Sequence, residues 1–294
     1  MYSQLRILNN KEILVQEKST PYLTFRRYND LPYIKHCFTT KFGGVSKGIF
    51  SSLNLSFSRG DDTEAVKKNY ELLCESAGFT LKNIVMSDQV HKTDVLTIDD
   101  NVLDTLDNND FSKRKLNCID GMITNIPGVM LLTYYADCVP LYFVDTKNKA
   151  IGLSHSGWKG TVGLMGKRTV EAMKKAYNTD PKDLICAIGP SICIDCYEVS
   201  EDVIEVLNTN FVKEGIISKD SYSTDDFYYK KDNGKYQLDL WTANRAVLEN
   251  AGVNPDNIIT SSVCTCHHKD LLFSHRATAG KRGNLAAAIE LTSS

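Results

Sequence analysis

The stretch "YYADCVPLYFVDTKNKAIGLSHSGWKG", residues 134–160, decides how the middle of this chain folds. Two apolar, β-rich runs, 139–145 and 150–156, flank the polar segment 146–149, which predicts two strands joined by a tight turn. Asp137 and Cys138 stand at the start of the first strand, and His155 stands at the end of the second. A hairpin built only for packing needs no acid, thiol and imidazole at its ends, so this arrangement indicates a functional site.

The flanking sequence predicts more strands and several amphipathic helices. Apolar runs predict strands at 84–90, 128–135, 184–189 and 257–264. Helical periodicity covers 63–78, 161–177, 200–211 and 238–252, with Gly78 and Gly252 as C-caps and Ser200 as an N-cap. No linker or repeat divides the chain. Strands that cluster in the middle with helices between them predict mixed sheets in an α+β protein, with one domain over residues 1–294.

Composition and charge exclude several classes of function. The 294 residues are 42% hydrophobic and 24% charged, with a net charge of -2 and no basic arm, so nucleic acid is not an expected partner. No signal peptide or membrane-spanning run is present, and nine scattered cysteines fit a reducing compartment. We therefore expect a cytoplasmic protein without a membrane partner. No dinucleotide-binding or P-loop pattern follows a strand.

Three side chains at predicted strand ends can bind a metal ion. They are His91 in "QVHKTDV", Cys138 and His155. Two imidazoles and one thiolate suit zinc, and three protein ligands leave a fourth position for water or substrate. Two other interpretations remain open on the residues alone. One is a nucleophilic Cys138 activated by an imidazole that Asp137 orients; the other is a buried thiol with two histidines bonded to backbone.

Two further groups of residues have a chemical interpretation and an ordinary structural one. "CTCHHKD", residues 264–270, offers four potential metal ligands, but adjacent residues rarely reach one ion. Cys193 and Cys196 form a C-x-x-C that could complete a structural zinc site with that segment. Lys41, Lys159 and Arg276 each lie beside glycine-rich turns, where cations and backbone N–H groups form anion sites. Each cation alone is ordinarily a solvated surface group.

Taken together, these segments resemble a known family. Eight blocks in order, from about His36 to Ala287, resemble the bacterial polyphenol oxidase or laccase-domain family, also described as purine nucleoside phosphorylases. The blocks are "FTTKFGGVS", "SLNLSFSRGDD", "QVHKTDV", "DGMITNIPGVMLLTYYADCVPLYFVD", "SHSGWKGT", "IGPSICIDCYEV", "DLWTANRAVLENAGV" and "CTCHHKDLLFSHRATAGKRGNLAA". Eight successive blocks make the resemblance far more specific than any single motif.

The resemblance implies a fold and a set of site residues. The fold is a four-layer α+β sandwich of mixed sheets flanked by helices. The metal triad of the family matches His91, Cys138 and His155, and it implies zinc, with copper as the alternative. It gives the "CTCHHKD" segment no known metal role. The implied catalytic residues are Cys138 and His155, and those for substrate or phosphate are Lys41, Asn54, Lys159 and Arg276. Asp137 is a third candidate catalytic residue, because an acid directly before the metal ligand can serve as a general acid or base.

The resemblance also implies an activity. It is phosphorolysis of adenosine, guanosine, inosine and 5′-methylthioadenosine, together with adenosine deamination. For the oligomeric state we expect a monomer or homodimer. Lys41 and Lys159 stand where the family often has arginine, which keeps the charge but loses the bidentate fork. Two alternatives are copper-dependent oxidation of phenols, for which three ligands supply only one of several coppers, and non-catalytic nucleoside binding.

Overall fold

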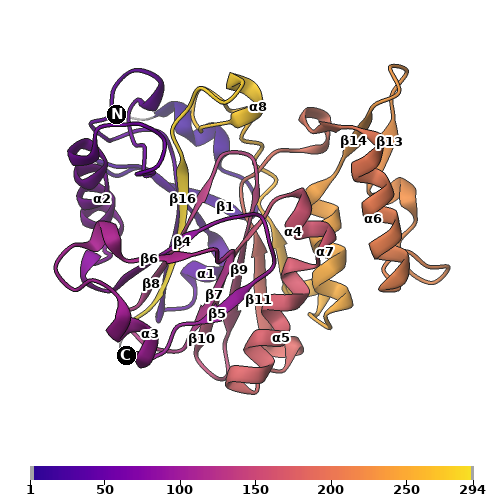
Figure 1. Cartoon of the computed structure of the whole chain (residues 1–294), viewed down its shortest axis with the longest axis horizontal. Helices are drawn as coiled ribbons and strands as arrows, with labels where there is room; N and C mark the ends of the chain where they lie inside the picture. The colour runs from indigo at the N-terminus through magenta and orange to yellow at the C-terminus, as the bar shows by residue number, and fades with distance from the viewer. Residues whose placement is uncertain (1–2, 293–294) are drawn as a thin grey trace.

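A seven-stranded sheet forms one half of the centre of the molecule (Figure 1). The computed structural model describes residues 3–292. The strands of this sheet follow the order β1-β2-β3-β16-β8-β4-β6. Their bounds are β1 Ile13–Gln16, β2 Tyr22–Phe25, β3 Ile34–Thr39, β16 Leu285–Leu291, β8 Met130–Tyr135, β4 Ile84–Asp88 and β6 Lys115–Asn117. The first and last strands of the chain thus lie within the same sheet.

A six-stranded sheet forms the other half, in the order β15-β11-β9-β10-β7-β5. At its centre, β9 and β10 form the antiparallel hairpin that the sequence predicts, with His155 opposite Pro140. Asp145 Oδ1 stabilises the turn by accepting the backbone N–H groups of Lys147 and Asn148. The bounds are β15 Ile258–Thr260, β11 Leu184–Ile188, β9 Val139–Asp145, β10 Ala150–Ser156, β7 Gly121–Thr124 and β5 Val95–Thr97.

Helices cover the outer faces of both sheets. The helices are α1 Arg26–Asn29, α2 Thr63–Ala77, α3 Asp100–Thr105, α4 Trp158–Val162, α5 Met165–Tyr177, α6 Glu201–Lys213, α7 Leu240–Asn250 and α8 His275–Thr278. A third, small sheet of β12 Glu198–Val199, β14 Tyr236–Leu238 and β13 Tyr228–Lys230 lies beside α6 (Figure 1). No helix within residues 3–292 is long and apolar enough to cross a membrane.

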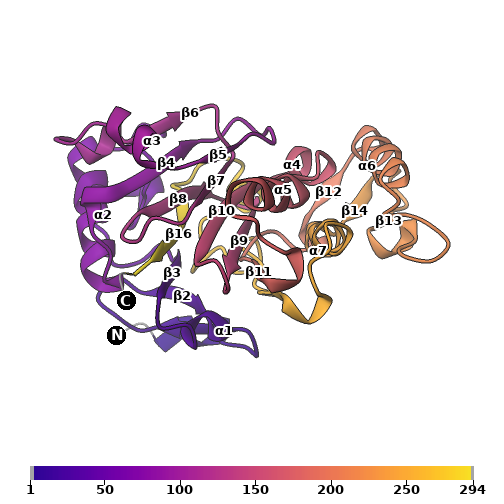
Figure 2. The ribbon, with the colours of Figure 1, turned by 90° about the horizontal axis from the view of Figure 1, so that it is seen from below.

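Three hydrophobic cores separate four layers. One core lies between the two large sheets, one between the seven-stranded sheet and α2, and one between the six-stranded sheet and α5 to α7. Strand β9 contributes side chains to two of these cores. Tyr142 and Val144 belong to the core between the two sheets, whereas Leu141 and Phe143 belong to the core beneath α5 to α7. Figure 2 shows α2 and the α5–α7 pair on opposite sides of the sheets. The predicted α+β, four-layer architecture is confirmed.

The predicted boundaries differ from the observed ones in two informative places. The predicted helix at 161–177 is divided into α4 and α5, because Leu164 adopts a left-handed backbone with φ of 64°. The predicted strand at 257–264 is ordered as a strand only over Ile258–Thr260, since Ser262 also has a positive φ and the chain then turns. Gly78 caps α2 as expected. The single-domain prediction included residues 1, 2, 293 and 294, which lie outside the described residues.

A buried histidine makes the stability of this fold depend on pH. His36 Nε2 accepts the Phe25 N–H at 2.8 Å, and burial lowers the pKa of His36 to about 3. The unfolded chain therefore binds a proton below pH ~6.5 that the native state does not bind, so stability falls as the pH drops from ~6.5 towards 3. This single group should cost about 2 kcal/mol of unfolding free energy at pH 5.

Replacing this histidine tests the prediction. Gln in His36→Gln can accept the same N–H without titrating, so its stability relative to the wild type should improve by about 2 kcal/mol between pH 7 and pH 5. Urea denaturation at the two pH values measures the difference. A stability difference that stays constant with pH would contradict it.

Candidate metal centre and its pocket

Two loops and one strand end bring the three predicted metal ligands together. Cys138 immediately precedes β9, and His155 is the penultimate residue of the antiparallel β10. His91 lies in the loop after β4, from the other sheet. His91 and Asp137 adopt positive φ angles of 60° and 94°, and such strained residues gather where the surrounding structure holds a functional site.

The three ligand atoms are close enough to share one ion. One donor atom from each of His91, Cys138 and His155 lies within 4.8 Å of the others, and Cys138 Sγ is 4.0 Å from His91 Nε2. The two imidazole rings are nearly perpendicular, at 87°. A Cβ added to Gly157 would lie 3.0 Å from Cys138 Sγ and 3.2 Å from His91 Cδ2. Glycine at 157 therefore leaves room for the ligands to converge.

A buried carboxylate, Asp120, orients two of the ligands. His155 Nδ1 hydrogen-bonds Asp120 Oδ1 at 2.8 Å, which turns Nε2 of the ring towards the other ligands. Asp120 also accepts the backbone N–H groups of Val90, His91 and Lys92, each at 3.0 Å. Burial alone would raise the pKa of Asp120, but these hydrogen bonds hold it below its usual value. A carboxylate behind a ligating histidine is the usual outer-shell arrangement of metal sites.

The electrostatics of the site favour a thiolate. Burial raises the pKa of Cys138, but His155 and His91 lower it more strongly, to about 6. Burial lowers the pKa of His155, but Cys138 and Asp120 raise it to about 9. Cys138 is therefore a thiolate at neutral pH, which is the form that binds metals. Two imidazoles, one thiolate and an outer carboxylate fit zinc, and the same donor set also accepts copper.

The triad lines a pocket of about 260 Å³, close to the ~300 Å³ lower end for small-molecule sites. Three buried polar atoms of its lining residues have no hydrogen-bond partner within residues 3–292: Ser87 Oγ, Arg282 Nε and Asn284 Oδ1. Because buried polar atoms are almost always satisfied, these atoms indicate that a ligand or ordered water completes the pocket.

Two arginines give this pocket a positive wall. Arg59 and Arg282 both line it, and neither forms an ion pair with a carboxylate among the described residues. Burial, together with the nearby Arg59, lowers the pKa of Arg282 to about 10. The sequence reasoning missed both, although Arg282 precedes Gly283 and meets the same criterion of a cation beside a glycine turn. It also missed Asp120, which has no motif of its own.

The cations expected to bind phosphate lie elsewhere. Lys41 donates from Nζ to the Lys269 carbonyl at 2.9 Å and lines a neighbouring pocket, which shares Arg282 as a wall. Lys159 is exposed on α4, with its ammonium over the Trp158 ring. The guanidinium of Arg276 donates hydrogen bonds to the backbone carbonyls of Cys196 and Glu198. The structure therefore brings none of the three into the triad pocket, and their phosphate role stays a prediction.

Asn54 supports the pocket from behind. Its side chain is fully buried and its amide is satisfied within the protein. Oδ1 accepts the backbone N–H groups of Ser56 and Asn284, and Nδ2 donates to Asp61. These bonds fix the loop that carries Arg59 against the segment that carries Asn284. A direct substrate contact of Asn54 stays a prediction.

Asp137 is not among the residues that line the pocket. Its Oδ1 accepts the Thr265 hydroxyl at 2.7 Å, and its Oδ2 accepts the backbone N–H of Arg276 at 2.6 Å. Both oxygens are thus engaged by the C-terminal segment. We infer that Asp137 positions the loop before Cys138, in place of the general acid or base that the sequence suggested.

Replacing Asp137 distinguishes the two roles. In Asp137→Asn, Oδ1 can still accept the Arg276 N–H while Nδ2 donates to the Thr265 hydroxyl, so the rate of the adenosine deamination that the resemblance implies should fall less than about tenfold. Loss of a general acid or base costs roughly 100-fold or more. Asp137→Ala, which removes both bonds, should weaken metal binding, as measured by chelator competition. A metal-loaded Asp137→Asn with a hundredfold lower rate would restore the catalytic role.

The fold and the site define a class of protein: a four-layer α+β sandwich with a candidate His–Cys–His metal centre at a sheet edge. A family model described as multi-copper polyphenol oxidoreductase laccase matches residues 35–292. The chain belongs to this family.

Relatives of known name support this placement. A purine nucleoside phosphorylase of Bacteroides thetaiotaomicron is 34% identical over 256 residues, which cover 87% of this chain and 91% of the relative. An adenosine deaminase named RL5, from an unknown prokaryotic organism, is 34% identical and covers 81% of this chain and 87% of its own length. The crystal structure of YlmD from Geobacillus stearothermophilus matches with a TM-score of 0.85 and 32% identity, over 96% of this chain and all of that one.

Proposed function

We propose that this protein is a metal-dependent purine nucleoside phosphorylase. One observation carries the proposal: the candidate metal triad lines one small pocket together with two arginines and three buried polar atoms, and within the described part of the chain the arginines have no acidic partner and the polar atoms no hydrogen-bond partner. Relatives named purine nucleoside phosphorylase support the choice of substrate class. We propose adenosine, guanosine, inosine and 5′-methylthioadenosine as substrates and zinc as the metal.

The residues of the pocket suit both substrates of this reaction, the phosphate and the nucleoside. In phosphorolysis a phosphate oxygen forms a bond to ribose C1′ while the C1′–N9 bond breaks, and the purine leaves with a proton. Arg282 and Arg59 lower the free energy of the phosphate dianion in the pocket. Ser87 and Asn284 provide one hydroxyl and one amide for the hydroxyls of the ribose or the edge of the base.

The remaining groups hold the purine and the metal ligands. Phe57 lines the pocket and provides apolar surface for a base. His91, Cys138 and His155 would hold the metal, and Asp120 keeps His155 and the His91 loop in place. A bound zinc ion would act there as a Lewis acid or lower the pKa of a water molecule.

Adenosine deamination is the second candidate activity. The relative named adenosine deaminase favours it, as does a site that can hold a metal with an open position. In this reaction a water oxygen replaces the C6 amino group of adenine and ammonia leaves. Water is the co-substrate, so the arginines should contribute less than they do in phosphorolysis.

Product analysis with adenosine tests both activities. We expect purified protein to form adenine and ribose 1-phosphate only when phosphate is present, and inosine with or without phosphate. Formation of neither product, with nucleoside binding retained, would overturn the proposal in favour of a binding protein. Oxygen-dependent oxidation of a phenol by copper-loaded protein, without nucleoside turnover, would instead favour the polyphenol oxidase alternative.

A further inference from the structure

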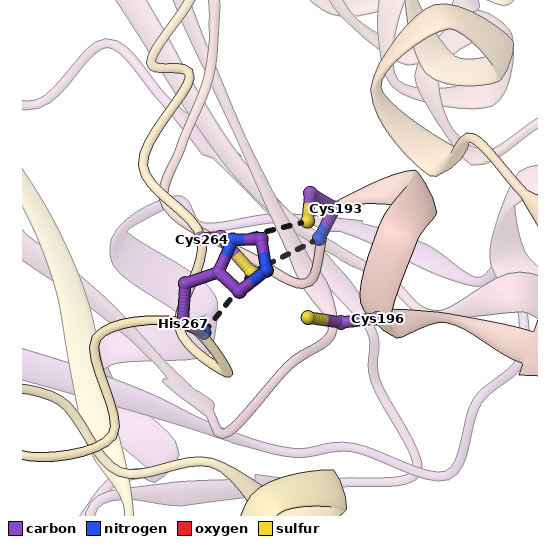
Figure 3. A group of neighbouring side chains, drawn as sticks. All are labelled: Cys193, Cys196, Cys264 and His267. Atoms are coloured by element: carbon purple, nitrogen blue, oxygen red, sulfur yellow. Dashed lines mark hydrogen bonds between the residues drawn. The ribbon is translucent and has the colours of Figure 1, made fainter.

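Two segments far apart in sequence pair beside the loop that carries Asp137. Ser191 N donates to the Val263 carbonyl at 3.2 Å, and Thr265 N donates to the Ser191 carbonyl at 3.1 Å. This short parallel pairing places the C-x-x-C of Cys193 and Cys196 against Cys264 and His267 (Figure 3). The "CTCHHKD" segment and the C-x-x-C are therefore halves of one cluster.

The four side chains direct their donor atoms towards a common centre. One donor atom each of Cys193, Cys196, Cys264 and His267 lies within 4.8 Å of all the others. Cys193 Sγ and His267 Nδ1 are 3.7 Å apart. Around a tetrahedral zinc ion, with Zn–S of about 2.3 Å and Zn–N of about 2.1 Å, ligand atoms are separated by roughly 3.5–3.8 Å. The cluster therefore needs a contraction of about 1 Å or less to close around an ion.

The backbone around Cys264 supplies a second, independent observation. Its Sγ accepts the backbone N–H of Cys193 and the backbone N–H of His267, both at 3.4 Å. Hydrogen bonds of this kind are typical outer-shell contacts that hold a metal ligand in place. Both donors belong to other members of the cluster. The two loops therefore fix the position of this sulfur within the group through their own backbone.

We propose that Cys193, Cys196, Cys264 and His267 bind a second zinc ion with a structural role. Three thiolates and one imidazole fill all four positions of a tetrahedral ion and leave none for substrate. Soft thiolates select zinc over magnesium, calcium and manganese. This donor set differs from the triad, which has one thiolate and an open position. Cys266 and His268, next to these ligands, are not part of the group.

The second zinc ion fastens the loops that position the first site. Ile192 N donates to the Asp137 carbonyl at 3.0 Å, and Thr265 donates to the Asp137 carboxylate. Residues adjacent to the cluster thus hold Asp137 from two sides, directly before the ligand Cys138. Linking residues 193–196 to residues 264–267 should lower the free energy of the native state and keep this loop in place.

Zinc content of matched variants tests the proposal. Wild-type protein purified with reductant should hold two equivalents of zinc per chain, Cys138→Ser one, Cys193→Ser one, and the double variant none. Cys266→Ser, in the same segment but outside the group, should keep two. After cobalt substitution, Cys138→Ser should retain the intense sulfur-to-cobalt absorption of a tetrahedral site with several thiolates, and Cys193→Ser should lose most of it.

These readouts do not depend on any nucleoside chemistry. If Cys193→Ser is insoluble, the zinc content of Cys138→Ser alone decides, because that variant leaves all four proposed ligands intact. Metal-free Cys138→Ser under zinc-saturated, reducing conditions would overturn the proposal. So would a mass spectrum showing Cys193 joined to Cys264 or Cys196 by a disulfide in protein purified with reductant. Lower thermal stability of Cys193→Ser than of Cys266→Ser would support it.

Discussion

Cys138→Ser should lose one equivalent of metal and nearly all phosphorolysis. Serine stays protonated at neutral pH, whereas the pKa of Cys138 is lowered to about 6 by its imidazole neighbours, so only cysteine offers a negative ligand. The loss of rate should exceed the roughly 10–100-fold that removal of an outer-shell partner costs. Elemental analysis and the rate of hypoxanthine release from inosine measure the two effects.

A matched control separates the role of this cysteine from a general effect of losing a thiol. Cys118 is exposed and belongs to neither cluster of potential ligands, so Cys118→Ser should keep the metal content and rate of the wild type. The metal content of Cys138→Ser must be compared with that of the wild type, because the cluster of Cys193, Cys196, Cys264 and His267 should keep its own ion. Cys138→Ser with the metal content and metal affinity of the wild type would contradict the assignment of the triad.

Arg282→Met should raise the KM for phosphate roughly 10–100-fold, the scale of one lost hydrogen bond to a charged group of ~1.5–3 kcal/mol. The Arg282 side chain lines the triad pocket, its Nε has no partner within residues 3–292, and burial lowers its pKa to about 10. A phosphate dianion would satisfy the guanidinium. The KM for the nucleoside and the rate of deamination should change much less, because neither depends on phosphate.

Three other cations help to test this prediction, one as a control and two as the competing candidates for phosphate binding. Lys281 is exposed beside Arg282, and Lys281→Met should leave the KM for phosphate nearly unchanged. Lys41→Met and Arg276→Met test the cations that the sequence singled out. A large increase in the KM for phosphate in Arg276→Met, with none in Arg282→Met, would move the anion site to the segment of α8.

The hairpin, and with it two of the three triad residues, was predictable because its signals are local. Continuous apolar, β-rich runs on both sides of a polar turn define β9 and β10, and antiparallel pairing then places Cys138 and His155 at one edge. His91 joins them from the other sheet, which no local pattern shows. Its block in the family resemblance supplied that link.

Other parts of the fold and site depend on contacts that sequence patterns do not encode. The segment "LAAAIEL" of β16 is rich in alanine, a strong helix former, yet it is a central strand because it is packed between two cores. Asp120 carries no motif, and its importance arises only when the loop of His91 folds over it. Cys193 and Cys264 are 71 residues apart, so their approach emerges only from the tertiary structure.

Inosine phosphorolysis by chelated and metal-restored protein tests the central claim most directly, because inosine cannot be deaminated further at C6. We expect hypoxanthine release to equal the phosphate consumed, to stop when the triad metal is removed, and to return when zinc is restored to the wild type but not to Cys138→Ser. Hypoxanthine release that continues in metal-free protein or without phosphate would contradict a phosphorylase that depends on His91, Cys138 and His155.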